Sequence, residues 1–211
     1  PLLNATTTSC NDIFGANNAA AQKNPILETP DGSKEVLYSV NLSTGDGNSG
    51  KADFMTGNHW IARCLLQSED ITGDGGLVVF APNGWKYTFN KFGPTSAASD
   101  VNWNMSSGTP PPGKYPTQRY AYNVTKIEDL NGNTINISYE EYGNNLPKFL
   151  RIASVSTSGG QLSFSYVGDK LDTISGMGVT LRYNHQGRYL GSVNIGGELT
   201  WSYEYYPGGG D

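Results

Sequence analysis

The chain has 211 residues, with 14 Lys and Arg against 19 Asp and Glu and a formal net charge of −5. This length suffices for one large all-β domain or for two small ones. No dense basic run is present to neutralise a phosphate backbone, so we expect no nucleic-acid partner. No stretch approaches the roughly 20 apolar residues that cross a bilayer as a helix, so we expect no membrane span.

The composition favours strands and tight turns over helices. The chain contains 13 Tyr, 7 Phe, 4 Trp and 27 Gly, and aromatic residues are typical of strands as glycine is of turns. The many Asn, Gly, Ser and Thr residues are typical of secreted proteins, in which Cys10 and Cys64 either form a disulfide or remain two free thiols. Because the sequence begins at Pro1 without Met, we expect a processed piece of a longer protein.

Residues 1–57 are predicted to form an irregular N-terminal segment. Pro25 and Pro30 break any helix that might begin near residue 17. Residues 35–42 have strand character and lead into a Gly-rich turn at 43–50. The pattern leaves open whether this segment joins the main sheet.

Residues 58–119 are predicted to form a β region that precedes the repeats. Apolar runs occur at 59–66 and 76–80, and the turn Ala81-Pro-Asn-Gly84 joins the second run to residues 85–89. This arrangement predicts a β-hairpin. The Pro-, Ser- and Gly-rich stretch 93–116 cannot form a regular element and is predicted to be a long loop.

A short unit recurs along the chain, in which a glycine is followed by alternating apolar and polar residues and then by an aromatic ring. A period of roughly 20 residues marks stacked supersecondary elements. Shorter apolar runs at 150–152, 171–174 and 189–193 are the expected partner strands. We therefore predict an all-β fold of antiparallel, repeated β-hairpins over 120–205, as a repeat array or a curled sheet, with a tail at 206–211. The five copies of the unit are 84–89, 132–139, 160–166, 178–183 and 197–203.

Within each copy the apolar residues fall on one face and the polar residues on the other. Leu199, Trp201 and Tyr203 share a face in the last copy, and Trp85 is in phase with Tyr87 in the first. Such alternation is typical of a sheet that is buried on one side. We therefore expect Trp201 and Trp85 to belong to the core.

Several segments resemble the RHS/YD-repeat family of secreted and cell-surface proteins. Tyr183-Asn-His-Gln-Gly-Arg-Tyr-Leu190 is similar to the Tyr-Asp-x-x-Gly-Arg-Leu unit of that family, although the chain has no Tyr-Asp dipeptide. Residues 58–60 and 76–89 resemble the segment that precedes the repeats. The resemblance covers residues 58–205, and its other matches are 126–135, 150–155 and 162–166.

The resemblance has implications for fold and function. In the family, arrays of hairpins coil into a hollow β-shell that can enclose a toxic C-terminal domain, and carbohydrate binding has been ascribed to the repeats. For this chain it implies a non-catalytic structural or binding segment of a secreted or cell-surface bacterial protein. Its partners would then be further repeats or domains of the parent chain.

Motifs for cofactors and catalysis are weak. Gly45–Lys51 satisfies most of a P-loop, but no helix of sufficient length can follow it, so we expect a polar turn. Calcium is a candidate ligand for Asp46, Asn48 and Asp53 or for Glu69, Asp70 and Asp74, although ordinary turns explain both loops better. With two histidines, His59 and His185, and no Cys/His cluster, we expect no metal site.

Catalysis has little support in the sequence. The Gly-x-Ser-x-Gly motif of a hydrolase nucleophile is absent, so we do not expect an enzyme. Sequence alone cannot place any two of Glu69, Glu140, Glu141 and Glu204 at the separation that a glycosidase requires.

The tryptophans are the strongest candidates for ligand contact. A flat ring on a rigid strand offers apolar area to the face of a pyranose. We name Trp103, Trp60 and Trp85 as candidate ligand-binding residues, with Trp103 favoured because it lies in a polar loop. A carbohydrate-binding module is thus the alternative to the structural segment, and a glycoside hydrolase or lyase is a weaker third hypothesis.

Overall fold

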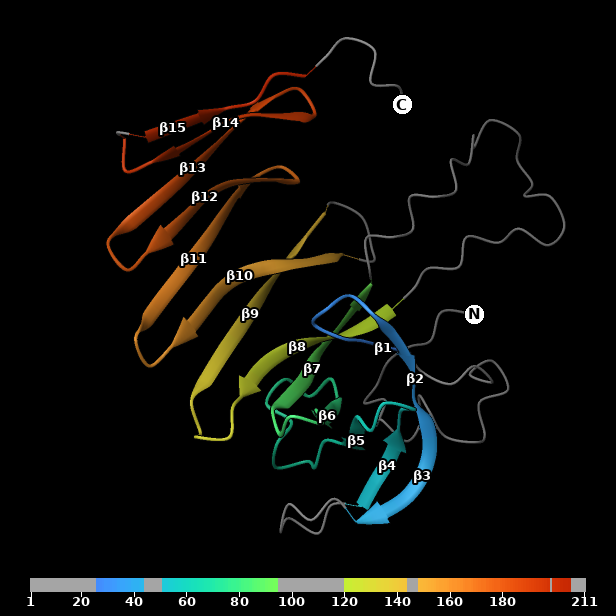
Figure 1. Cartoon of the computed structure of the whole chain (residues 1–211). Helices are drawn as coiled ribbons and strands as arrows, with labels where there is room; N and C mark the ends of the chain where they lie inside the picture. Colours follow the sequence, from blue (N-terminus) through green and yellow to red (C-terminus); the bar gives the residue numbers. More distant parts are fainter. Residues whose placement is uncertain (1–25, 44–50, 95–119, 144–147, 198, 206–211) are drawn as a thin grey trace, which may run out of the picture. The chain divides into compact units, whose positions relative to one another are not determined.

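The computed structural model describes residues 26–43, 51–94, 120–143, 148–197 and 199–205 (Figure 1). These residues form strands, turns and bends, with no helix among them. The chain divides into two compact units, Pro1–Thr134 with Gly143–Leu150 (unit 1) and Ile135–Tyr142 with Arg151–Asp211 (unit 2).

The predicted all-β, antiparallel fold is confirmed. Strands β1 (Ile26–Glu28) and β2 (Lys34–Val36) form a small two-stranded sheet, and thirteen further strands form one sheet in which neighbours in sequence are hydrogen-bonded neighbours. The thirteen are β3 (Tyr38–Ser43), β4 (Lys51–Met55), β5 (Ile61–Cys64), β6 (Leu77–Phe80), β7 (Lys86–Pro94), β8 (Tyr120–Glu128), β9 (Thr134–Tyr142), β10 (Phe149–Thr157), β11 (Gly160–Val167), β12 (Lys170–Gly176), β13 (Val179–Gln186), β14 (Tyr189–Ile195) and β15 (Leu199–Ser202).

The expectation of an irregular segment over residues 1–57 is wrong for its described part. Residues 26–55 carry the four strands β1 to β4, and β3 and β4 belong to the large sheet. Residues 1–25 and 44–50 lie outside the described residues. Leu27 on β1 and Leu37, between β2 and β3, belong to the core of unit 1, a tertiary contact that the local pattern does not reveal.

Unit 1 is buried on both faces of its central strands. On one face the β1–β2 hairpin contributes Leu27 to a core with residues of β4 to β7. On the other face Arg63 and Val78 are Cα partners on β5 and β6 and are 2% and 1% exposed. The core residues of the first face are Leu27, Leu37, Phe54, Ala62, Leu77, Val79, Ala81 and Tyr87.

Four hairpin loops of unit 1 share one geometry. Each loop has five residues. The N–H of the first residue donates to the carbonyl of the fifth, and the N–H of the fourth residue donates to the carbonyl of the first. The fourth residue has a positive φ, which favours glycine. The loop predicted at Ala81–Gly84 is one of the four and joins β6 to β7 as expected. The loops span 29–33, 56–60, 81–85 and 129–133, with Gly32, His59, Gly84 and Gly132 as their fourth residues.

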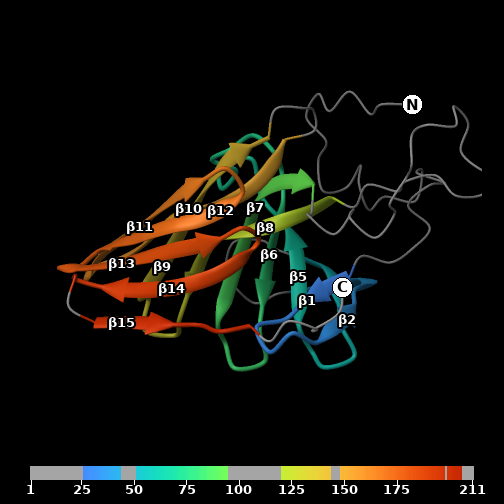
Figure 2. The ribbon, with the colours of Figure 1, turned by 90° about the horizontal axis from the view of Figure 1, so that it is seen from above.

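Unit 2 is a meander of hairpins whose strands lie side by side in both ribbon views (Figures 1 and 2). The partner strands predicted at 150–152, 171–174 and 189–193 are confirmed as parts of β10, β12 and β14. Val155 faces Leu162 in the β10–β11 hairpin, and Ile174 faces Leu181 in the β12–β13 hairpin. The two residues of each pair are separated by the same number of residues in the sequence. The two hairpins are therefore equivalent, and the step from Val155 to Ile174 is one period of the array.

A side-chain clasp recurs with this period in unit 2. Tyr166 donates its hydroxyl to the Ile152 carbonyl at 2.7 Å, His185 Nε2 contacts the Leu171 carbonyl at 2.7 Å, and Tyr205 donates to Leu190 at 2.9 Å. The three acceptors are equally spaced in the sequence, one period apart. The structure thus pairs Tyr166 with His185, whereas the sequence pattern pairs Tyr166 with Tyr183.

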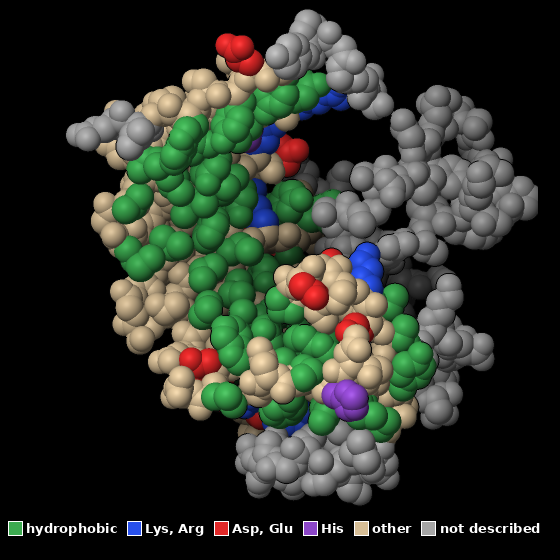
Figure 3. All heavy atoms as spheres, viewed as in Figure 1, with side chains coloured by type: hydrophobic (Ala, Val, Ile, Leu, Met, Phe, Trp, Pro, Cys, Tyr) green, Lys and Arg blue, Asp and Glu red, His purple; other side chains and the backbone are tan. Residues whose placement is uncertain are grey.

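The apolar face of unit 2 is not a closed core. Figure 3 shows hydrophobic side chains gathered over strands β9 to β13. Val193 is the only buried hydrophobic side chain in the described part of unit 2, and Trp201 and Tyr203 are 50% and 47% exposed. Our expectation that Trp201 belongs to the core is therefore wrong, because alternation predicts a shared face but not a second layer that covers it.

Candidate ligand-binding site

Three of the equivalent loops of unit 1 surround one pocket of about 480 Å³. Loop 29–33 joins β1 to β2, loop 56–60 joins β4 to β5, and loop 81–85 joins β6 to β7. Trp60 and Trp85 occupy the same position, the fifth, in two of these loops. The repeated turn geometry therefore brings two of the three candidate tryptophans to one site, which we call the tryptophan pocket.

The floor of the tryptophan pocket is a row of three aromatic rings. The Trp60 and Tyr87 centroids are 5.8 Å apart and the Trp85 and Tyr87 centroids are 6.5 Å apart, with tilted ring planes. Tyr87 belongs to the core and Trp60 packs against it. Trp85 is 39% exposed, so our expectation that it belongs to the core is wrong.

Two carboxylates stand among the lining residues. The Asp31 carboxylate accepts hydrogen bonds from the Thr29 hydroxyl at 2.5 Å and from the Ser33 N–H at 3.1 Å, and these lower its pKa. Glu35 accepts a bond of 2.5 Å from the Asn58 side chain, which lowers its pKa. Both carboxylates are therefore ionised at neutral pH. Neither has the raised pKa that a glycosidase general acid requires.

The backbone around the pocket is fixed by the loops themselves. Trp60 N–H donates to the Thr56 hydroxyl at 3.2 Å, and Trp85 N–H donates to Asn83 Oδ1 at 3.1 Å. Thr56 is 2% exposed. These bonds hold the backbone of each tryptophan to its own turn.

The other candidates from the sequence are not brought to this site. Trp103 and Cys10 lie outside the described residues, as does the loop predicted at 93–116 beyond Pro94. Cys64 is disulfide-bonded. The segment after Gly45–Gly50 begins β4, a strand, so the helix that a P-loop requires does not follow.

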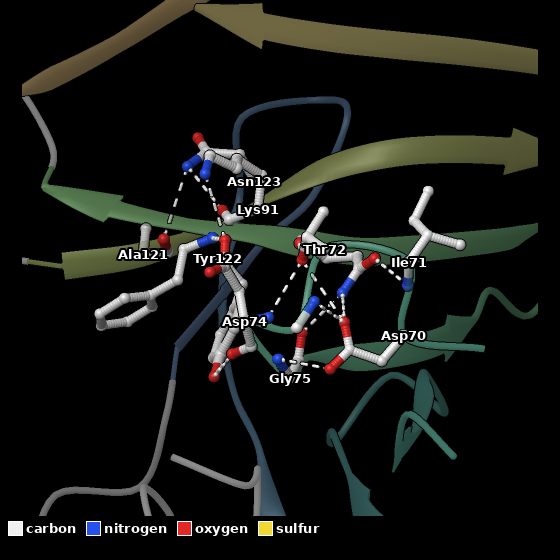
Figure 4. A network of polar contacts seen from close by, with 12 residues as sticks. Asp70, Ile71, Thr72, Asp74, Gly75, Lys91, Ala121, Tyr122 and Asn123 are labelled. Carbon is white, nitrogen blue, oxygen red and sulfur yellow. Dashed lines mark hydrogen bonds and ion pairs between the residues drawn. The ribbon is translucent and has the colours of Figure 1, made fainter. Parts of the chain in front are cut away.

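The acidic loop 65–76 is closed by its own hydrogen bonds (Figure 4). Asp70 accepts the N–H groups of Gly73 and Gly75, both at 2.9 Å, and the side-chain amide of Asn90 at 2.7 Å. Burial raises the pKa of Asp70, but these hydrogen bonds outweigh it and the net shift is downward. Asn90 is 0% exposed and also donates to the Gly75 carbonyl at 2.8 Å.

Its three carboxylates have separate partners. Glu69 binds Arg63 and Asp74 contacts Lys91 at 3.3 Å, while Asp70 binds the loop backbone. Asp53, from the other calcium candidate, accepts the Cys64 N–H at 2.7 Å. Within the described residues, no three His, Cys, Asp or Glu side chains are grouped to hold a metal ion. Each of the three carboxylates is therefore engaged by a partner within the described residues.

The remaining acidic candidates, Glu140, Glu141 and Glu204, belong to unit 2. Glu140 accepts a 2.6 Å bond from Arg151, whose guanidinium also lies 4.1 Å from the centroid of the Tyr166 ring. Glu204 lines a second pocket of about 680 Å³ with Tyr189, Tyr203 and Tyr205. Sequence reasoning missed this pocket, because its tyrosines come together only through the register of β13, β14 and β15.

Comparisons with known proteins do not identify the chain. No protein-family model matches it, and no curated protein matches it either. In the described part of the chain, no helix has the length and apolar character to cross a membrane.

Proposed function

We propose that this chain is a non-catalytic structural segment of a secreted RHS/YD-like protein. Its hairpin array would form a wall together with further repeats or domains of the parent chain. The observation that supports the proposal is the clasp of unit 2, whose acceptors recur at one constant spacing. A repeated contact of this kind belongs to a quasi-one-dimensional array, in which each hairpin is stabilised by its neighbours.

A second set of contacts follows the same period. The Arg151 guanidinium donates to the Gly168 carbonyl at 2.6 Å, and Lys170 donates to the Gly187 carbonyl, so each cation reaches the turn beyond the next strand. Register shifts recur at Ser165/Tyr166 and at Asn184/His185, again one period apart. Turns, bulges and cations therefore repeat together.

The array leaves two surfaces that suit a structural wall. The apolar face is only partly buried, with Trp201 and Tyr203 exposed. Strand β15 is the last strand of the sheet and pairs within the described residues with β14 alone. An unpaired strand edge accepts another strand readily, so a neighbouring hairpin could continue the sheet.

An in-frame duplication tests the proposal. We would insert a second copy of residues 169–187 directly after Gly187 in the full chain, which adds one complete period. An array predicts a folded protein with additional slowly exchanging amides and an unfolding midpoint in urea at least equal to that of the parent.

The control insertion contains the same segment, 169–187, in scrambled order. It should lower the midpoint and add no protected amides. If the in-frame copy destabilises the protein as much as the scrambled one, unit 2 is not an array and the proposal fails. Turnover of any polysaccharide by the purified chain would contradict the non-catalytic part.

A further inference from the structure

We propose that the tryptophan pocket of unit 1 binds a neutral saccharide, with Trp85 and Trp60 as the platform for pyranose rings. This activity lies outside the hairpin array, so it stands or fails independently of the structural role. The argument begins with the shape of the site. A pocket of about 480 Å³ has the size of small-ligand sites, which fall at about 300–1,000 Å³.

The aromatic row supplies the contact that sugars require. Pyranose rings expose C–H groups on one face, and flat aromatic rings offer matching apolar area at small entropic cost. Tyr87 is 8% exposed and has a ring contact with each tryptophan, whereas Trp85 is 39% exposed. The exposed ring is therefore held in place by a buried one.

The polar lining supplies hydrogen bonds for sugar hydroxyls. A carboxylate offers about four acceptor positions. The Glu35 carboxylate is hydrogen-bonded by the Asn58 and Thr56 side chains and by the Asn58 backbone, which leaves part of that capacity for a ligand. Asn58 and Asn83 line the same pocket and carry amide donors. A few polar groups around an apolar floor is the usual composition of a specific small-ligand site.

The charge of the lining selects the class of saccharide. The pocket contains Asp31 and Glu35 and no Lys or Arg among its described lining residues. Two ionised carboxylates repel uronic acids and sulfated sugars at short range. The ligand is therefore a neutral glycan rather than an acidic one.

The test is isothermal titration calorimetry of the purified chain against short oligosaccharides of cellulose, xylan, mannan, chitin, starch and laminarin, with oligogalacturonate and a heparin fragment as acidic probes. We expect saturable binding of at least one neutral oligosaccharide and none of the acidic ones. Trp85→Ala should weaken that binding about three- to tenfold, the loss expected for one ring contact. Because Trp85 is exposed, this variant should stay folded, and circular dichroism checks that it does.

Trp201→Ala is the matched control, because Trp201 is also exposed but belongs to unit 2. It should leave the affinity unchanged. Glu35→Gln keeps an acceptor oxygen but removes one of the two charges, so it should weaken the exclusion of oligogalacturonate, although Asp31 stays ionised. The proposal is overturned if no neutral oligosaccharide binds, if Trp85→Ala binds as well as the parent, or if Trp103→Ala alone abolishes binding.

Discussion

The guanidinium of Arg63 holds both carboxylate oxygens of Glu69, at 2.6 and 2.7 Å. Arg63 is 2% exposed, whereas the Glu69 side chain is 24% exposed. The pair ties loop 65–76 to β5, because Arg63 lies on the strand and Glu69 in the loop. The carboxylate of Glu69 is thus more accessible to water than the guanidinium of Arg63 with which it pairs.

This asymmetry predicts unequal effects of the two single substitutions. Glu69→Gln leaves the buried guanidinium facing a neutral amide and should cost about 3–5 kcal/mol of unfolding free energy. Arg63→Met leaves a carboxylate that water can partly solvate, and it should cost less. Urea unfolding of both variants measures the difference. Equal losses would show that burial of the arginine does not determine the cost.

Acid should weaken the protein through this loop. The hydrogen bond from Arg63 lowers the pKa of Glu69 below its ordinary value of 4.5. A carboxyl whose folded pKa is lowered contributes stability that is full above its unfolded pKa and is lost as pH falls through the folded pKa. The urea midpoint should therefore fall as pH drops below about 4.5. Glu69→Gln should flatten this dependence, whereas Glu28→Gln, at an exposed site on β1, is the charge-matched control.

The clasp row of unit 2 gives a third prediction. Tyr166→Phe keeps the ring beside Arg151 but removes the bond to the Ile152 carbonyl, so it should cost about 1 kcal/mol. Tyr203→Phe is the control, since the Tyr203 hydroxyl makes no hydrogen bond with the part of the chain that the structure describes. His185→Tyr places a tyrosine at the position equivalent to Tyr166, so it should preserve stability. Hydrogen exchange of the Leu171 region and urea midpoints provide the measurements, and a large loss in His185→Tyr would contradict the equivalence of the clasps.

The hairpins were predictable from the sequence because their signals are local. Alternation set the strands, and Gly84 and Gly132 marked turns that require a positive φ. Their period was visible only approximately. The true spacing depends on bulges at Ser165/Tyr166 and Asn184/His185, and a bulge is a property of two paired strands rather than of one.

Burial and the candidate site could not be predicted from the sequence alone, because both depend on the tertiary structure. Trp201 has the phase of a core residue, but exposure depends on whether another layer covers the sheet. Trp60 and Trp85 are separated in the chain by strands β5 and β6, and they meet because two hairpin loops of the same geometry adjoin. No sequence pattern marked Asn90 as a structural residue, because its role depends on its hydrogen bonds to Asp70 and Gly75 of loop 65–76.

The equivalent hairpin loops provide a last prediction, on backbone strain. His59 has φ 65° where the other three loops have glycine. A side chain in this conformation costs roughly 1–2 kcal/mol, partly offset by the greater entropy of an unfolded glycine. His59→Gly should therefore raise the unfolding free energy by about 0.5–1 kcal/mol. An unchanged or lower value would show that the His59 side chain makes a compensating contact.

Two alanine substitutions separate this strain from steric clash. A Cβ at Gly132 meets nothing within 4 Å, whereas one at Gly84 meets Leu130 Cδ2 at 2.4 Å, and both residues have a positive φ, of 81° and 84°. Gly132→Ala should thus cost about 1 kcal/mol, from strain alone. Leu130 is 75% exposed and meets the added Cβ with the end of a flexible side chain, so it can turn aside, and Gly84→Ala should cost about as much as Gly132→Ala. Urea unfolding of both variants measures the two losses. A larger loss for Gly84→Ala that Leu130→Ala relieves would show that Leu130 cannot turn aside.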